Sequence, residues 1–247
     1  AMANNTIGQY NTAVGYSALG ANTTGTFNIA IGLNTLGFNQ TGANNTALGY
    51  QANFLGTGST NNVSVGFRSL YNTTGSDSVA LGYQAGYQAA SATYSNFLGY
   101  QAGYQASGAS HSSFIGYRAG YQAPNANNSI FIGRNAGAND TVNNASNKSS
   151  ILIGNYTSAS GYSDSIAIGQ GAANSASQQL NIGNVLYATS INNAITPSST
   201  PVLGKVGVRV ENPQYTLDVN GSGNFSSGIY VSGNSTFYNN LSISGHL

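Results

Sequence analysis

The sequence predicts an all-β protein: a parallel β-roll or β-solenoid of about eleven coils, followed by a neck and a short β-rich shaft. Three observations predict it. A short element ending in Gly recurs eleven times along the chain. Only 4% of the 247 residues are charged, whereas an ordinary soluble domain carries roughly 25%. Gly, Asn, Ser, Thr, Ala and Gln replace the charged residues, and the Gly and Asn density disfavours helices.

The recurring element is an aliphatic residue followed by Gly, and it reads as the end of a short strand. A small residue typically lies between two branched ones, which predicts a period-two strand with one buried face. Gly then permits a backbone conformation or a close approach that a Cβ would block. The successive Gly residues are 17, 17, 17, 16, 17, 17, 17, 21, 15 and 14 positions apart. They are Gly15, Gly32, Gly49, Gly66, Gly82, Gly99, Gly116, Gly133, Gly154, Gly169 and Gly183.

A coil of about 17 residues cannot bury a core alone, so we expect the coils of residues 1–185 to stack in parallel. Eleven coils at the usual strand spacing give a rod roughly 50 Å long. The rest of each coil is rich in turn-forming residues, and the segment 82–89 recurs closely at 99–106 and 116–123. The 21-residue step predicts an inserted loop at 139–148.

The pattern stops after Gly183, and the remaining chain divides into two parts. Residues 186–204 contain Pro197 and Pro201 in a Ser/Thr-rich stretch, which predicts a neck or linker. Residues 205–247 carry a 12-residue repeat of short apolar segments and Gly turns, which predicts a β-rich shaft. The start and the end of the sequence suggest a fragment of a longer fibre.

The charge content also excludes several classes. A net charge of +1 does not supply the basic face that nucleic-acid binding needs, and no apolar run reaches the roughly 18–20 residues of a membrane span. Like charges stacked at every coil would repel along the rod, whereas Asn, Ser, Thr and Gln ladders hydrogen-bond to themselves. The scarcity of charge therefore agrees with stacked coils.

Groups suited to catalysis or metal binding are few. Asp77 and Asp164 each lie five residues before a repeat Gly, where an Asp caps a turn. His111 has neighbouring Ser residues but no orienting acid, and the chain has no Cys. We expect no enzyme activity, no catalytic or metal-binding residues and no cofactor.

Aromatic residues form two columns when the coils are aligned. Tyr16, Tyr50, Phe67, Tyr83, Tyr100 and Tyr117 follow the repeat Gly, and a second column lies four positions later in three coils. The columns are either packing ladders between chains of an oligomer or a surface that grips a ligand. The candidate surface-binding residues are Tyr83, Tyr87, Tyr100, Tyr104, Tyr117, Tyr121, Arg68 and Arg118.

Segments such as Asn28-Ile29-Ala30-Ile31-Gly32, Asp77-Ser78-Val79-Ala80-Leu81-Gly82 and Asp164-Ser165-Ile166-Ala167-Ile168-Gly169 resemble the head repeats of YadA-type trimeric autotransporter adhesins. The resemblance covers roughly residues 4–185 and implies a left-handed parallel β-roll with three chains side by side. The coils here are longer than the family's usual length of about 14 residues, which only the last step matches.

The segment 204–221 resembles junctions into the shafts of phage tail fibres and bacterial surface fibres. Together the resemblances imply a homotrimeric, extracellular or cell-surface fibre segment that adheres to an unidentified receptor, glycan or matrix protein. A phage tail fibre is the alternative, and it would place the chain on a virion. An ice-binding solenoid and a hexapeptide-repeat acyltransferase are remote alternatives, because the Thr columns are broken and the apolar spacing is five rather than six.

Overall fold

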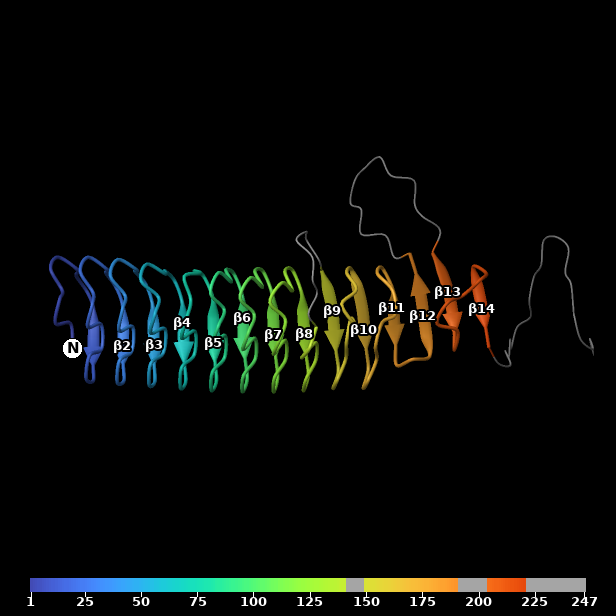
Figure 1. Ribbon diagram of the computed structural model, residues 1–247, viewed down its shortest axis with the longest axis horizontal. Helices are drawn as coiled ribbons and strands as arrows, with labels where there is room; N and C mark the ends of the chain where they lie inside the picture. Colours follow the sequence, from blue (N-terminus) through green and yellow to red (C-terminus); the bar gives the residue numbers. More distant parts are fainter. Residues whose placement is uncertain (141–148, 191–203, 221–247) are drawn as a thin grey trace, which may run out of the picture.

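The computed structural model describes residues 1–140, 149–190 and 204–220. Within these residues the chain forms fourteen strands and no helix, which confirms the all-β class. The strands stack in sequence order into one continuous sheet that runs along an elongated rod (Figure 1). The N-terminal coils lie at one end of this rod and β14 lies toward the other.

Eleven of the strands are the repeated elements, one for each coil, joined by about ten turns of the chain. Each pairs in parallel with the next, so this part is a parallel β-solenoid, as predicted. The strands are β1 Thr12–Val14, β2 Ile29–Ile31, β3 Thr46–Leu48, β4 Val63–Val65, β5 Val79–Leu81, β6 Asn96–Leu98, β7 Ser113–Ile115, β8 Ile130–Ile132, β9 Ser150–Ile153, β10 Ser165–Ile168 and β11 Leu180–Ile182.

The register of the sheet follows the sequence repeat. The aliphatic residue before each Gly pairs with its counterpart in the next coil, as Val14 pairs with Ile31 and Leu98 with Ile115. This holds across the 21-residue step, where Ile132 pairs with Ile153. The extra residues of that step therefore leave the strand ladder unbroken. Of the loop expected at 139–148, residues 141–148 lie outside the described residues.

Three further strands continue the sheet with a different topology. They are β12 Leu186–Thr189, β13 Lys205–Val208 and β14 Leu217–Val219. β12 runs antiparallel to both β11 and β13, and β14 is parallel to β13. β12 thus lies within the segment expected to be a neck. The remainder of that neck at 191–203, and the shaft repeats beyond residue 220, lie outside the described residues.

The short strands point their central residue inward and their two flanking residues outward. In β2, Ala30 is fully buried while Ile29 and Ile31 are about 40% exposed (41% and 39%). A coil of this size has a narrow interior, and its other sides also direct side chains inward, so the middle of each strand supplies one wall of the core. The aliphatic residues on the other face of the strand remain at the surface.

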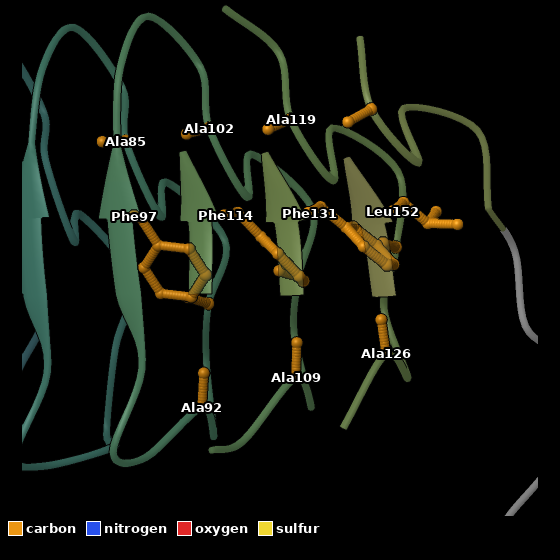
Figure 2. Close-up of a cluster of buried hydrophobic side chains, with 14 of the residues drawn as sticks. Ala85, Ala92, Phe97, Ala102, Ala109, Phe114, Ala119, Ala126, Phe131 and Leu152 are labelled. Carbon is orange, nitrogen blue, oxygen red and sulfur yellow. The ribbon is translucent and has the colours of Figure 1, made fainter. Parts of the chain in front are cut away.

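The core changes composition along the rod, and in several coils a large residue on one side is matched by a small residue on the other. Toward the N-terminus a small strand residue, such as Ala30, shares its core cluster with Leu36. In the middle, Phe97, Phe114 and Phe131 occupy the strand position, between rows of alanines from the other sides of the coils (Figure 2). Leu152 continues the row in β9.

The repeat Gly is required by close packing of the backbone between coils. Gly99 has a φ of +134°, and a Cβ added to it would lie 2.5 Å from the carbonyl oxygen of Gly116 in the next coil. Ten of the eleven repeat Gly residues share this positive φ, from +117° to +138°. A side chain at this position would strain the backbone and separate the coils.

Buried polar side chains form a hydrogen-bonded column inside the coils, at the position just before the strands. The Asn45 amide donates to Asn28 Oδ1 at 3.0 Å and to the Ser59 carbonyl at 2.8 Å. Its own Oδ1 accepts the Asn62 backbone N–H at 3.0 Å. From Ser78 onward, hydroxyls replace the amides in the same column. An amide or hydroxyl both donates and accepts, so it repeats without the repulsion that a column of charges would suffer.

Candidate binding surface

The two aromatic columns that the sequence predicts are stacked ladders on the surface of the rod. In the first, adjacent rings from Tyr50 to Tyr117 have centroids 5.0–5.2 Å apart and are nearly parallel. In the second, adjacent rings from Phe54 to Tyr121 are 5.0–5.4 Å apart. Tyr16 shares the first column by position, but Leu33 occupies that position in the intervening coil. The ladders include Phe54 and Tyr71, which the sequence analysis did not single out.

A column of Gln and Arg side chains runs between the two aromatic ladders. Arg118 Nε donates to Gln101 Oε1 at 2.9 Å, and the Gln101 amide donates to Gln84 Oε1 at 2.9 Å. The guanidinium carbon of Arg118 lies 5.5 Å from the Tyr117 ring centre and 4.8 Å from that of Tyr121. Arg118 therefore contacts a ring of each ladder, in an arrangement suited to cation–π attraction.

Arg68 repeats this arrangement three coils away. Its Nε donates to Gln51 Oε1 at 2.8 Å, and its guanidinium carbon lies 5.2 Å from the Phe67 ring centre and 5.3 Å from that of Tyr71. The structure therefore brings all eight candidate surface-binding residues onto one face of the rod.

Residues with a left-handed backbone conformation recur along this face and determine where its side chains lie. Arg68, Gln84, Gln101 and Arg118 all have φ between +51° and +53°. Each comes two positions after a repeat Gly, and this position has a positive φ in ten of the eleven coils. Because the turns in consecutive coils are alike, side chains at equivalent positions lie above one another, and the columns are straight enough for their rings to stack.

The stacked geometry limits what the aromatic ladders offer to a ligand. Each internal ring has both faces covered by its neighbours, so only ring edges and hydroxyls face solvent. Burial raises the pKa of Tyr104 above its ordinary value, and the neighbouring Tyr121 and Tyr87 add to the rise. This hydroxyl therefore remains a hydrogen-bond donor at neutral pH. A free ring face is available only where a ladder ends.

A third surface column consists of the aliphatic residues that precede the repeat Gly. All eleven point out of the coil, eight of them exposed and three half-buried. They form one uninterrupted apolar stripe along β1 to β11, and scattered apolar residues on ordinary surfaces do not do this. The aliphatic stripe consists of Val14, Ile31, Leu48, Val65, Leu81, Leu98, Ile115, Ile132, Ile153, Ile168 and Ile182.

The acids and the histidine considered as catalytic candidates lie at one corner of the coils. Asp77 accepts a hydrogen bond from the Asn61 amide at 2.8 Å, and His111 packs beside Tyr94 with ring centres 4.9 Å apart. Asp77, His111 and Asp164 all have φ between +55° and +59°. Asp77 and Asp164 precede β5 and β10, so the length of several coils separates them.

One buried carboxylate was not singled out from the sequence. Asp140 is almost completely buried, and its two oxygens accept the backbone N–H groups of Ala159 and Gly161 at 2.8 and 2.9 Å. Burial raises the pKa of Asp140 above its ordinary value, and the two backbone hydrogen bonds partly offset the rise. Its position at the start of the predicted insertion at 139–148 was the available signal. Asp140 fastens the coil before the inserted segment to the coil after it.

Within the described ranges, no three His, Cys, Asp or Glu side chains come together as metal ligands would. No helix in that same part of the chain is long and apolar enough to span a bilayer. Comparisons with protein-family models, curated sequences and solved structures find no protein that this chain matches.

Proposed function

We propose that this chain is a structural and adhesive segment of an extracellular homotrimeric fibre. It binds a host, cell or matrix surface through contacts that are repeated along the rod and among the three chains. Multivalent binding of this kind gives high avidity from weak individual contacts. Sequence resemblance to YadA-type heads supports trimer formation, and the aliphatic stripe is the observation that carries the proposal.

The aliphatic stripe is apolar surface that a single chain leaves exposed to solvent and that another chain could cover. Covering apolar surface contributes roughly 25 cal/mol for each Å² removed from water, and a column of eleven aliphatic side chains offers such surface over the whole solenoid. Parallel alignment of identical chains would match coil with coil along the rod. A closed ring of three chains would cover the stripe on every chain without leaving it open for further growth.

The aromatic ladders are less suited to this interface than the aliphatic stripe. The first ladder stops at Tyr117, since Arg134, Asn155 and Gln170 follow in the next three coils. The aliphatic stripe continues through all of these coils. An interface that runs the length of the solenoid therefore uses the stripe and leaves the aromatic face for another partner.

Light scattering on the purified chain tests the assembly. The expected mass is close to three times the 25.2 kDa of one chain. Replacing two stripe residues, Leu81→Asp with Ile115→Asp, places charges in the interface and should give monomers. The matched control, Gln88→Asp with Gln122→Asp, adds the same charges to the same coils at exposed positions outside the stripe and should leave the mass unchanged. A monomeric native chain would contradict the proposal.

A phage tail fibre segment is the second candidate, because the segment 204–221 resembles such fibres. The two candidates differ in the surface that they contact. Fluorescently labelled chain applied to animal cells, immobilised matrix proteins and a panel of bacteria separates them. Binding to cells or matrix supports the adhesin, and binding to bacteria alone supports the tail fibre.

A further inference from the structure

The second aromatic ladder ends at Tyr121, and a recess begins there. The Gln122 N–H donates to the Ala138 carbonyl at 2.7 Å, which places Ala138 of the next coil beside Tyr121. A methyl group thus occupies the position where the ladder would continue with a ring. A recess of about 360 Å³ opens at this point, lined by Tyr121, Ala138 and residues of the neighbouring columns.

At the recess, an aromatic ring lacks one of the two stacked neighbours that cover the ring faces elsewhere in the ladder. One face of Tyr121 stacks on Tyr104, with centroids 5.0 Å apart and an interplanar angle of 11°. The coil on the other side contributes Ala138 in place of a ring, so no second ring stacks on Tyr121 there, and the guanidinium carbon of Arg118 lies 4.8 Å from its ring centre. Tyr156 lines the recess from the coil beyond, and Asn135 and Asn139 add amides. Aromatic faces combined with a few convergent polar groups are typical of small-molecule sites.

One arginine lines the recess, and a second lies beside one of its lining residues. Arg118 lines it, and the hydrogen bond from its Nε to Gln101 holds the side chain in place while its terminal nitrogens remain for a ligand. The guanidinium carbon of Arg134 lies 5.3 Å from the ring centre of Tyr156. No carboxylate lies in the aromatic or Gln/Arg columns of the coils from Gly49 to Ala138. A guanidinium binds a carboxylate through two parallel hydrogen bonds.

We propose that this recess binds an acidic sugar residue of a glycan. The C–H face of the pyranose ring packs on Tyr121, its hydroxyls hydrogen-bond with Asn135 and Asn139, and its carboxylate pairs with Arg118. This proposal names a ligand class for the proposed function. It rests on that function because a surface fibre is what would bring the rod into contact with glycans. The recess itself is built by residues of one chain.

Titration calorimetry on the whole chain tests the recess with three probes: 3′-sialyllactose, trigalacturonate and lactose. One or both acidic probes should bind, and lactose should bind at least about tenfold more weakly, because it lacks the charge-assisted hydrogen bonds. Whichever acidic probe binds more tightly distinguishes a sialic acid from a uronic acid. Equal binding of lactose, or no binding of either acid, would overturn the proposal.

Matched variants localise the binding. Arg118→Gln installs the residue found at this position in the two preceding coils and should weaken acid binding by about tenfold or more. Ala138→Tyr extends the aromatic ladder into the recess and should abolish binding while the fold is kept. Arg68→Gln removes the same charge from the same column three coils away and should leave binding unchanged. An equal loss in Arg68→Gln would show general electrostatic attraction and overturn the assignment to the recess.

The same samples distinguish a failure of this proposal from a failure of the proposed function. A trimer that binds none of the probes contradicts the recess but leaves the fibre assembly. A monomer that binds an acidic probe, with the expected response of the variants, contradicts the assembly but supports the recess.

Discussion

Gly120 lies directly against the ring of Phe114: a Cβ added to Gly120 would be 2.5 Å from Phe114 Cδ2. The same relationship joins Gly103 to Phe97 and Gly137 to Phe131. Near the N-terminus it is reversed, since Ala30 occupies the strand position and Leu36 occupies the position that corresponds to Gly120. These coils therefore fill their interior from one side or the other, and a large residue on both sides would not fit.

This size relationship predicts a rescue. Phe114→Ala should lower the free energy of unfolding by about 3–5 kcal/mol, because it leaves a cavity in a close-packed core. Gly120→Leu alone should also destabilise the chain through overlap with Phe114. The double substitution should recover part of the loss, since Leu36 and Gly120 have similar φ values of +50° and +60°. Thermal unfolding followed by circular dichroism measures the effect, and a double variant less stable than Phe114→Ala would contradict the size relationship.

The repeat Gly is expected to tolerate no side chain. Gly99→Ala combines a strained φ with a Cβ 2.5 Å from the Gly116 carbonyl, and strain at such a φ alone costs about 1–3 kcal/mol. Gly58→Ala is the control, because its Cβ would lie no closer than 3.3 Å to the Thr41 hydroxyl. Equal melting temperatures for the two variants would show that the close approach of the coils does not require glycine.

The buried Asn ladder should contribute more to stability than its exposed counterpart. Asn45→Ala leaves the Asn62 N–H and the Ser59 carbonyl without their partner, which costs about 1–3 kcal/mol for a buried group. Asn96→Ala removes an exposed amide whose hydrogen bond to the Ser113 hydroxyl is 3.4 Å long, and its effect should stay within about 0.5 kcal/mol. Denaturant unfolding compares the two, and similar losses would refute a special role for the buried ladder.

Asp140 should make stability depend on pH in the direction opposite to that of an ordinary ion-paired carboxylate. Its pKa is raised in the folded chain, so folding favours the protonated acid. Its contribution is greatest below the ordinary Asp pKa and declines as the pH rises through the raised value. The melting temperature of the native chain minus that of Asp140→Asn should therefore fall between pH 3 and pH 7. A constant difference would contradict the burial effect.

Replacing Asp140 by Ala tests its fastening role separately. The N–H groups of Ala159 and Gly161 would lose their acceptor, at a cost of about 1–3 kcal/mol for the buried Ala159 group and less for the half-buried Gly161 group. Hydrogen exchange should speed up at these two amides, while amides in β5 and β6 remain protected. Unchanged exchange at Ala159 and Gly161 would show that another acceptor replaces the carboxylate.

Spacing along the sequence determined the strand positions, their parallel order and their register. A period of about 17 residues with a Gly at one fixed position admits only one in-register stack, and the same period placed the aromatic residues in columns. The scarcity of charged residues also agrees with this arrangement, because a residue type repeated at one coil position lies next to the same type in the adjacent coil, where like charges would repel.

Only the tertiary structure decided which face of each strand is buried. Ile29 and Ile31 are more apolar than Ala30, yet Ala30 is inside, because the opposite side of the coil brings Leu36 into the same core. It also decided that the tyrosine faces cover one another and that Ala138 leaves Tyr121 without a stacked ring on its second side. These features depend on contacts between coils and across a coil, whereas the spacing of residues along the chain specifies only which positions are equivalent.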